Sequence, residues 1–462
     1  MDNRLKPYDE YNNIELPWLS KVPNHWKMTR NKNVLKMKKE RVGENHNQHI
    51  LLSLTKQGII ARDMINLKGK FPKEFDTYQS VNPGDIIFCL FDIDETPRTV
   101  GLSSLPGMIT GAYTVFEVED VNKKYLYYYY LSLDNHKQLK PLYTGLRKVI
   151  NTDAFLRTKM PYPPKEEQDQ IVRYLDSKLA KINKFIKNKK KLIELLKEQK
   201  QAIINQAVTK GLNPNAKIKP SGVEWLGDIP EGWYTVKIKQ VFDIVNGATP
   251  KSGVESYWDG SITWITPADL SKTDMYVRDS ERKITEEGFN SCSTKMVPQN
   301  NIVLATRAPI GNIRINSVDL CTNQGCKGLI LKTTDSISYL FYSLMSNEKQ
   351  LQRLGDGTTF AELSNSKLSV FKLPLPPLTE QQEIVTYIET KTQTIDKAIE
   401  RINKEIDLIT EYRTSLISNV VTGKVDVRNI EVEEVLEEIE EDIEDSDEEM
   451  LEKEEIYVGE ED

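Results

Sequence analysis

The chain has 462 residues, of which 39% are hydrophobic and 28% charged, and its longest apolar runs, such as Ile86–Phe91, are far too short to cross a bilayer. These short runs predict no membrane segment. The four cysteines show neither a disulfide framework nor a paired CxxC motif, so we expect a cytoplasmic protein with no bound metal. The net charge of −7 is unevenly divided along the chain. Residues 431–462 carry 19 acidic residues and one basic residue, whereas the first 430 carry 61 basic and 50 acidic residues. The balance of +11 in the first 430 residues favours a polyanionic partner such as nucleic acid, although many basic proteins have none.

Residues 1–162 are predicted to form a β-rich domain. The phrase ELPWLSKVPNHW (Glu15–Trp26) opens it, and short β-prone runs such as Pro83–Phe91 and Tyr113–Asp120 alternate with turn signals. A helix is predicted over Lys124–Leu133, where a run of tyrosines could stack on bases or pack in a core. The apolar setting favours the core.

Residues 163–212 are predicted to form a long helix. A proline pair precedes the phrase KEEQDQIVRYL, and apolar residues then recur at alternating steps of four and three when Lys189 and Lys200 are included in the frame. This heptad pattern indicates a helix that packs along a partner helix. The predicted seam residues are Leu175, Leu179, Ile182, Ile186, Ile193, Leu196 and Ile203.

The same order returns over residues 213–375 and 376–427. VEWLGDIPEGW (Val223–Trp233) resembles the first tryptophan phrase, β-prone runs and an aromatic helix (Ser338–Met345) follow, and PPLTEQQEIVTYI repeats the helical phrase 213 positions later without a gap. Thr379 is expected to cap the second helix in a capping box. The predicted seam residues of this helix are Ile388, Ile395, Ile399, Ile402, Ile406, Ile409 and Leu416.

The two heptad helices are each other's only obvious long partners in the sequence. A whole domain connects them, so either orientation is possible, and an antiparallel pair is favoured because it relates the two halves by a pseudo-twofold axis. Each helix could run for about 44 residues, or about 66 Å at 1.5 Å per residue. Two unrelated helices in separate cores are the alternative. Residues 428–462 form an acidic tail that is expected to be disordered or a frayed single helix.

This duplicated order resembles that of the specificity subunits of type I restriction–modification enzymes. The resemblance covers about residues 10–427, and its most specific elements are PLPPLTEQQEIVTYIETKTQTIDKAI and SLISNVVTGKVDV (Ser415–Val427). In the second β-rich region, NGATPKSGVESYWDGSITWITPADL and CTNQGCKGLIL also resemble target-recognition sequences, whereas the first region is a more divergent match. The acidic tail lies outside the resemblance.

The resemblance implies an α+β fold with two β-rich mixed α/β target-recognition domains, separated by two long antiparallel coiled-coil helices and related by a pseudo-twofold internal duplication. It implies double-stranded DNA as a partner, with each domain reading one half of a bipartite asymmetric site. It also implies docking of two methyltransferase subunits, which use S-adenosylmethionine, and through them of motor–nuclease (restriction) subunits, which use ATP and magnesium. Two identical partners need two equivalent docking surfaces, which would explain why the helical phrase occurs twice.

The sequence lacks the motifs that the partner chemistries need. An adenine methyltransferase needs a glycine-rich cofactor loop and an Asn/Asp-Pro-Pro-aromatic motif, and an ATP-driven motor needs a GxxxxGK[ST] loop; none of these occurs, and the four histidines show no ligand spacing. We therefore expect a recognition subunit that is not an enzyme and binds no cofactor itself. A self-sufficient methyltransferase or nuclease with diverged motifs is the alternative, and a coiled-coil scaffold without nucleic acid is disfavoured by the basic body.

Candidate DNA-binding residues can be selected by type and setting. Base edges are read best by Arg, Lys, Asn and Gln, with help from Thr and Ser. A solvated surface role is the competing interpretation for any single one. The candidates in turn-rich or motif-like stretches are Thr55, Arg62, Arg98, Arg147 and Lys148 in the first region, and Lys251, Thr266, Arg307, Asn323, Gln324 and Lys327 in the second.

Overall fold

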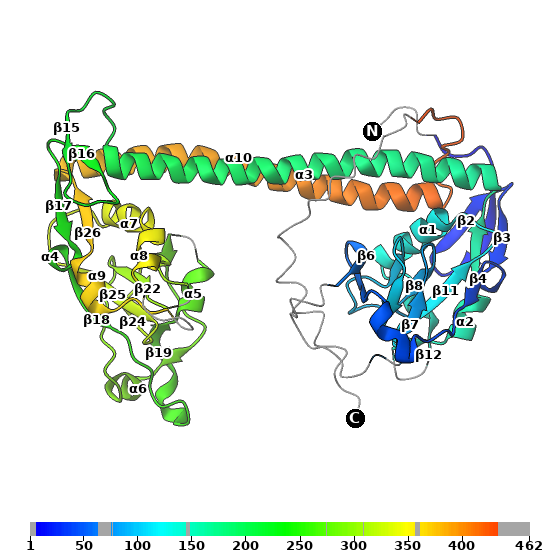
Figure 1. Ribbon diagram of the computed structural model, residues 1–462, viewed down its shortest axis with the longest axis horizontal. Coiled ribbons are helices and arrows are strands. Elements are labelled where there is room, and N and C mark those ends of the chain that lie inside the picture. The colour runs from blue at the N-terminus through cyan, green and yellow to red at the C-terminus, as the bar shows by residue number, and fades with distance from the viewer. Residues whose placement is uncertain are drawn as a thin grey trace. The chain divides into compact units, whose positions relative to one another are not determined.

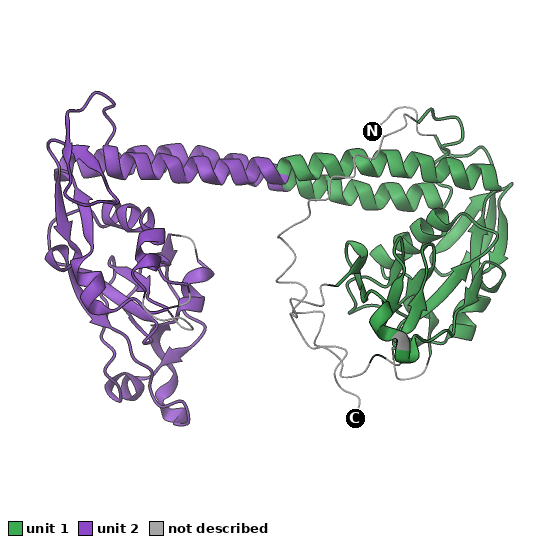
Figure 2. Cartoon of the chain, in the orientation of Figure 1, with its two compact units in different colours: residues 1–189, 404–462 green, residues 190–403 purple. Residues whose placement is uncertain are grey.

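The computed structural model describes residues 6–62, 75, 77–144, 148–273, 275–307, 309–355 and 361–432 (Figure 1). The chain divides into two compact units, one made of residues 1–189 and 404–462 and the other of residues 190–403. The boundary between the units crosses both long helices (Figure 2). Each unit therefore contains one β-rich region together with part of each long helix.

The first unit is built around a four-stranded antiparallel sheet in the order β4-β11-β8-β9. These strands are β4 (Leu35–Met37), β11 (Thr114–Val118), β8 (Ile86–Phe88) and β9 (Val100–Leu102). Two-stranded pairs accompany the sheet: β1 (Tyr11–Leu16) with β2 (Leu19–Pro23), β3 (Lys27–Arg30) with β14 (Lys159–Tyr162), β5 (Leu52–Thr55) with β6 (Gly58–Ala61), β7 (Gln79–Val81) with β10 (Gly107–Ile109), and β12 (Tyr143–Thr144) with β13 (Val149–Ile150). Its helices are α1 (Lys123–Asn135), α2 (Thr152–Arg157), the first part of α3 (Lys165–Lys210) and the last part of α10 (Leu378–Val421).

The second unit has a five-stranded sheet in the order β18-β25-β22-β23-β20. These strands are β18 (Phe242–Asn246), β25 (Cys326–Leu331), β22 (Ile302–Ala305), β23 (Ile313–Asn316) and β20 (Tyr276–Val277). The other strands are β21 (Lys283–Ile284), β19 (Trp258–Ile265) and β24 (Leu320–Thr322) in a three-stranded sheet, β15 (Ile218–Pro220) with β16 (Asp228–Pro230), and β17 (Tyr234–Lys237) with β26 (Lys372–Leu375). The helices are the last part of α3, the first part of α10 (Leu378–Val421), α4 (Ile238–Val241), α5 (Pro267–Ser271), α6 (Glu286–Asn290), α7 (Ile337–Met345), α8 (Glu348–Arg353) and α9 (Asn365–Val370).

The strand order confirms that the β-rich regions are copies. β4-β11-β8-β9 in the first unit repeats as β18-β25-β22-β23 in the second, which adds β20 at the edge, where it pairs in parallel with β23. In both units an aromatic helix, α1 or α7, follows the last strand of this sheet in sequence. The predicted α+β fold is therefore correct, and the duplication extends to the sheet topology.

The tyrosines of the aromatic helices pack in the cores, as predicted. Tyr125, Tyr129 and Tyr130 of α1 are at most 1% exposed, and Tyr339 of α7 is fully buried. Burial raises the pKa of the Tyr125 and Tyr339 phenols well above the usual value, so both stay neutral donors. The Tyr339 hydroxyl donates to Pro374 O at 3.0 Å. These rings are therefore not available to stack on bases.

The long helices run antiparallel in each unit. In the first unit Lys189 Nζ of α3 lies 2.6 Å from Glu405 Oε2 of α10, and in the second Lys200 Nζ lies 2.7 Å from Asp396 Oδ1. Partner numbers thus fall along α10 as they rise along α3, and within the first unit Arg413 Nη1 also donates to Asn183 Oδ1 at 3.2 Å. Every predicted seam residue on both helices is buried or half-buried. The two lysines that interrupt the apolar frame are held by carboxylates of the partner helix, and such polar seam positions help to define register.

The repeated glutamate attaches the start of each long helix to the tryptophan phrase. Trp26 Nε1 donates to Glu167 Oε1 at 2.9 Å, and Trp233 Nε1 donates to Glu380 Oε2 at 2.9 Å. Both indoles are buried. The Glu carboxylate lies in the first turn of its helix, where negative charge is favoured by the helix dipole.

The repeated glutamine attaches each long helix to the aromatic helix of the same unit. Gln168 Oε1 accepts from the N–H of Asn122, the capping residue of α1, at 2.8 Å. Gln381 Oε1 accepts in the same way from Ser336, which caps α7, at 2.8 Å. The duplicated Glu-Gln phrase is therefore a structural joint, and each half of the chain needs its own copy.

The expected capping box at Thr379 is wrong. Helix α10 begins at Leu378, so Thr379 already lies inside the first turn. Gln381 Nε2 donates to Pro376 O at 3.0 Å and thereby ties the first turn to the preceding proline pair. The sequence pattern resembles a cap, but the proline pair and the glutamine define the start of the helix.

Candidate nucleic-acid interface

Several loops of the second unit meet at one end of its five-stranded sheet. They follow β18, β19 and β22, and they precede β25 and α9. Backbone hydrogen bonds tie them together: Asn323 N–H donates to Ile265 O at 2.9 Å, Thr306 N–H to Gly325 O at 2.8 Å, and Leu363 N–H to Thr306 O at 3.0 Å. We call this set of loops the loop end of the second unit.

The loop end is removed from the start of α10. Helix α7 begins beside Gln381 of α10, and α8 follows the other end of α7. Gln352 of α8 donates to Ile310 O, in the loop after β22, at 3.1 Å. Helix α7, which has 9 residues and is about 14 Å long, and the following α8 therefore connect the start of α10 to the loop after β22.

Three cations predicted to bind DNA lie at this loop end. Arg307 Nη2 donates to Glu362 Oε2 at 2.7 Å, and both side chains are more than 40% exposed. Lys327 is 7% exposed, and its Nζ donates to Asn246 Oδ1 at 3.0 Å. Burial lowers the pKa of Lys327, and the nearby Arg307 guanidinium lowers it further, against the opposing effect of Glu362. Lys251 is exposed in the loop after β18.

The other three predicted residues of the second unit also lie here, and they stabilise the loops. The Thr249 hydroxyl donates to Gln324 Oε1, which links the loop after β18 to the loop before β25. Asn323 Oδ1 accepts from a backbone N–H two residues ahead, at 2.9 Å. The Thr266 hydroxyl donates to Asp269 at 2.6 Å in a capping box of α5. The structure thus brings all six predicted residues of this unit together.

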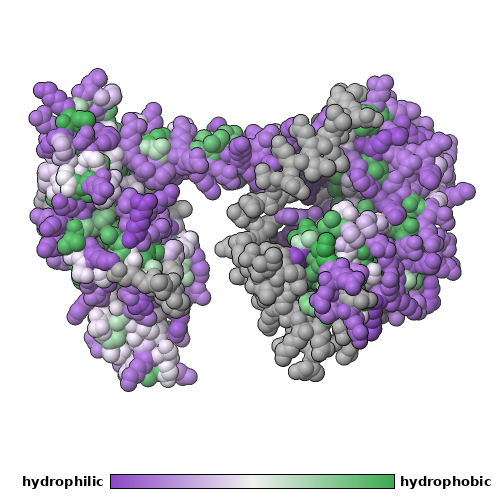
Figure 3. All heavy atoms as spheres, in the orientation of Figure 1, coloured by the Kyte–Doolittle hydropathy of each residue, from purple (hydrophilic) through white to green (hydrophobic). Residues whose placement is uncertain are grey.

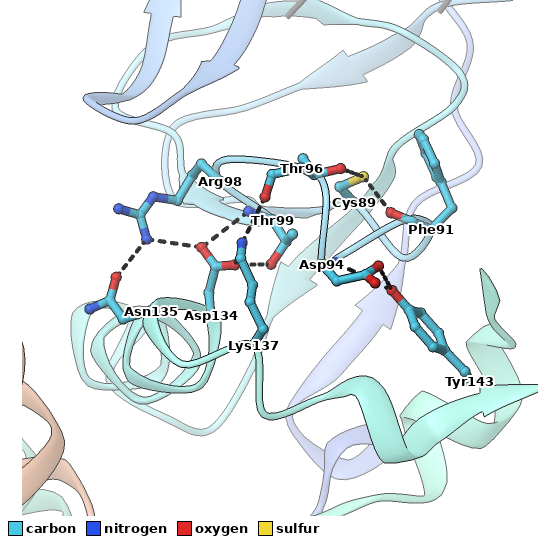
Figure 4. A network of polar contacts seen from close by, with 10 residues as sticks. All are labelled: Cys89, Phe91, Asp94, Thr96, Arg98, Thr99, Asp134, Asn135, Lys137 and Tyr143. Carbon is cyan, nitrogen blue, oxygen red and sulfur yellow. Dashed lines mark hydrogen bonds and ion pairs between the residues drawn. The ribbon is translucent and has the colours of Figure 1, made fainter. Parts of the chain in front are cut away.

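In the first unit Lys148 lies at the equivalent loop end. Its Nζ is 3.3 Å from Asp94 Oδ2 and also contacts Glu95. These contacts, the one with Glu95 first, raise the pKa of Lys148, while the hydrogen bond from Tyr143 and the contact with Lys148 lower the pKa of Asp94. Figure 4 shows Tyr143 and Asp94 pointing toward each other.

Arg98 is engaged by helix α1. Its Nη1 donates to Asp134 Oδ2 at 2.9 Å and to Asn135 Oδ1 at 3.0 Å, and the side chain is 12% exposed (Figure 4). Asp134 also accepts from Thr99 and Lys137. A buried carboxylate with this many donors anchors the loop after β8 to the end of α1.

The remaining predicted residues of the first unit are not brought to Lys148. Thr55 is 7% exposed, and its hydroxyl donates to Gly58 O at 3.1 Å in the β5–β6 turn. Arg62 is half-buried just after β6, and its N–H donates to Leu51 O at 2.9 Å. Arg147 lies outside the described residues. The prediction therefore assembles a cluster in the second unit and a scattered set in the first.

Sequence reasoning missed Asn246, Thr249 and Glu362, which are the partners of the predicted residues. Asn246 and Thr249 lie in the polar stretch NGATPKSG, so turn composition could have found them. Glu362 is 55 residues from Arg307 in sequence, and no local pattern indicates their pairing.

The described part of the chain holds no group of three or more His, Cys, Asp or Glu side chains that could bind a metal ion. Among these same residues, no helix is both long and apolar enough to cross a membrane.

Both long helices expose a leucine at equivalent positions. Leu195 of α3 is 53% exposed, and Leu408 of α10, 213 positions later, is 66% exposed. Phe185 of α3 is also 41% exposed, but its equivalent in α10 is the small, half-buried Ala398, so the phenylalanine is not repeated. Figure 3 shows hydrophobic residues among hydrophilic ones over the long helices. The exposed leucine is therefore a feature that both copies of the helical phrase keep.

The chain is an internally duplicated α+β protein in which two long helices pack together and each half carries a set of loops at one end of its sheet. This architecture is that of a recognition protein built from two similar halves. Its sequence matches the family described as the type I restriction modification DNA specificity domain over residues 108–195 and 230–408. The chain belongs to this family, which is the family that the sequence resembles. The alternative of a self-sufficient methyltransferase or nuclease is not favoured by this membership.

Proteins similar in sequence to this chain are also named as specificity subunits of type I restriction enzymes. The type I restriction enzyme MjaIX specificity subunit of Methanocaldococcus jannaschii is 34% identical over 42% of this chain and 45% of its own length. The MjaVIII specificity subunit of the same organism is 28% identical over 69% of this chain and 74% of its own length. A solved structure titled "Structural basis underlying complex assembly and conformational transition of the type I R-M system" covers 87% of this chain and 99% of its own, with a TM-score of 0.64 and 17% identity. The fold is therefore shared with that protein.

Proposed function

We propose that this chain is the DNA sequence-specificity subunit of a type I restriction–modification complex and performs no chemistry itself. Each β-rich unit reads one half of a bipartite, asymmetric duplex site. The observation that carries this proposal is the family membership of a chain whose two halves share one strand order but differ in the side chains at their loop ends. Copies of one fold with different polar residues suit two half-sites of different sequence.

The length of the long helices supports a spacer between the half-sites. α3 has 46 residues and α10 has 44. At 1.5 Å per residue each extends for about 66 to 69 Å, and one turn of B-DNA is about 34 Å. Helices of this length can hold two reading units at least a turn of DNA apart, so the bases between the half-sites need not be read.

The duplicated exposed leucines support docking of two methyltransferase subunits. Leu195 and Leu408 occupy equivalent positions on different helices, and each lies in a different unit. Two identical partners require two such equivalent surfaces on a chain without true symmetry. The methyltransferase subunits in turn attach the motor–nuclease subunits, and S-adenosylmethionine, ATP and magnesium are then bound by these partners.

The DNA proposal is tested by selection from a random duplex pool. The full-length chain, mixed with the methyltransferase subunits of its own system, is incubated with the pool, and the bound duplexes are sequenced. We expect two short conserved blocks separated by a spacer of fixed length and free sequence. Enrichment of a single contiguous block, or of none, would contradict the proposal.

The docking proposal is tested by matched single substitutions. Leu195→Asp and Leu408→Asp should each reduce the complex from two methyltransferase subunits to one, measured by native mass spectrometry, and the double variant should bind none. The control is Leu378→Asp, which changes an exposed leucine at the start of α10. Retention of two subunits by both single variants would exclude these leucines as the docking surface.

A further inference from the structure

The two loop ends share one structural landmark. In the first unit the chain after β8 forms an isolated antiparallel bridge between Phe91 and Val149, and in the second unit the chain after β22 forms one between Arg307 and Glu362. The adjoining hydrogen bonds agree, because Ile150 N–H donates to Leu90 O at 2.7 Å, as Leu363 N–H donates to Thr306 O at 3.0 Å. We call these sites the two bridge positions.

Strand register confirms that the bridge positions are equivalent. Phe88 is the β8 residue opposite Thr114 of β11, and Leu304 is the β22 residue opposite Lys327 of β25. In each unit the bridge residue comes three positions after this pair. A capping residue of the next short helix follows each bridge at the same distance, Asn151 before α2 and Ser364 before α9. The bridges are thus the same point of the duplicated fold with different side chains.

The bridge position of the second unit is charged. Arg307 is 44% exposed, and Glu362 takes one of its five N–H donors at 2.7 Å. Lys327, in the neighbouring strand, donates to Asn246. A carboxylate that holds one edge of a guanidinium orients it and leaves donors for a planar pair of acceptors.

The bridge position of the first unit is apolar. Phe91 is half-buried and stacks on Tyr113 with ring centroids 6.3 Å apart and an angle of 19° between the rings. Val149 is 41% exposed. Thr114 occupies the place that Lys327 has in the second unit. This surface offers methyl and ring contacts where the other offers hydrogen-bond donors.

Resting on the proposed function, we propose that the bridge position determines the base preference of each unit: Arg307 reads a guanine in the half-site of the second unit, and Phe91 with Val149 reads the methyl group of a thymine in the half-site of the first. Guanine presents O6 and N7 as paired acceptors in the major groove, and a guanidinium matches both. Thymine presents a C5-methyl group in the same groove, and apolar side chains contact it. The two half-sites therefore differ in chemistry as the two bridges do.

The first experiment measures base preference in the second half-site. Full-length wild type, Arg307→Ala and Arg307→Lys, each with its methyltransferase subunits, are used to select from the random duplex pool described above. Both variants should lose the preference for one guanine about 10- to 100-fold and keep the other half-site unchanged. Arg307→Lys keeps the charge but lacks the planar fork, so its overall affinity should fall less. The control Lys332→Ala removes an exposed cation just past the opposite end of β25 and should change no base preference.

The second experiment tests the thymine contact. In the selected duplex, each thymine of the first half-site is replaced by deoxyuracil, which lacks only the C5-methyl group. Binding by wild type should fall several-fold at one position, and Phe91→Ala should bind the two duplexes equally. Retained binding of the methyltransferase subunits reports that each variant is folded.

Failures of the two proposals give different results. If the wild type selects no bipartite site, the proposed function and this inference both fail. If it selects one, but Arg307→Ala changes only the salt dependence, then Arg307 contacts phosphate and this inference alone is wrong. The inference is also wrong if deoxyuracil has no effect at any position, or if Phe91→Ala and Arg307→Ala alter the same half-site.

Discussion

The two helix joints should differ in how much they depend on their glutamates. Glu167 Oε1 accepts from Tyr8 at 2.6 Å and from Trp26 at 2.9 Å, and both donors are 4% exposed. Glu380 accepts from Trp233 alone among the described donors, and that indole is 1% exposed. Replacing either glutamate by leucine keeps a similar volume and removes the acceptor. Glu167→Leu therefore leaves two buried donors without a partner, and Glu380→Leu leaves one.

The expected magnitudes follow from that difference. A buried donor without an acceptor costs about 1 to 3 kcal/mol, so Glu167→Leu should lower the free energy of unfolding by about 2 to 6 kcal/mol and Glu380→Leu by about 1 to 3 kcal/mol. Glu167→Gln is the matched control, because its oxygen can replace Oε1 and keep both buried donors. It changes only the group facing His25, whose ring nitrogen lies 2.8 Å from Oε2 and whose side chain is 33% exposed. We expect it to cost less than about 1 kcal/mol.

The assay is urea denaturation of the full-length variants combined with hydrogen-exchange mass spectrometry. Exchange should rise mainly in peptides around Trp26 and the first turn of α3 for Glu167→Leu, and around Trp233 and the first turn of α10 for Glu380→Leu, because each glutamate joins these two segments of its own unit. The reasoning is refuted if Glu380→Leu destabilises its unit as much as Glu167→Leu destabilises the other. It is also refuted if Glu167→Gln is as damaging as Glu167→Leu, since the negative charge rather than the acceptor would then matter.

Three further predictions concern the helices and their joints. A double-mutant cycle on Lys200 and Asp396 should give a coupling of about 0.3 to 1 kcal/mol that decreases at 1 M salt, because both side chains are at least one-third exposed; a salt-independent value would contradict this. Gly211→Ala and Gly423→Ala should each lower the free energy of unfolding, measured by thermal denaturation, by about 1 to 2 kcal/mol, because both glycines have φ of +72°. Gly423→Ala should lower it more, because its Cβ would lie 2.4 Å from a proline carbon, whereas the nearest atoms at Gly211 are 3.2 Å away. Tyr339→Phe should lower the free energy of unfolding by about 1 to 2 kcal/mol, because the buried Val208 and Pro374 carbonyls lose the hydroxyl that donates to them. An unchanged free energy of unfolding in urea denaturation would show that these hydrogen bonds contribute nothing.

The internal repeat was readable without a structure because duplication leaves a record at every level that depends on local sequence. The heptad spacing predicted the helix pair and its seam, since burying one stripe of a long helix requires the 3.5-residue period. The tyrosine run was correctly assigned to a core from its apolar neighbours. The same local reasoning failed at Thr379, where a capping pattern lies one residue inside a helix that begins earlier.

The role of the glutamate in the repeated phrase became clear only from the tertiary structure. From sequence, Glu167 is an acidic residue at the start of a helix; in the fold it accepts from an indole that lies 141 positions away. The loop ends depend on the same kind of distant contact. Thr55 and Arg98 satisfied the residue-type criterion for DNA binding, yet Thr55 closes a turn and Arg98 holds a buried aspartate.

The amino-acid sequence by itself determined the family, the duplication, the α+β class and the helix pair, because these follow from periodicity and from motifs that are continuous along the chain. Only the tertiary structure decided which side chains share a surface. Arg307 faces Glu362, and Phe91 stacks on Tyr113, because strand pairing brings together segments that are distant in the chain. Such pairs leave no periodic signal, since their geometry is set by sheet register and not by spacing in sequence.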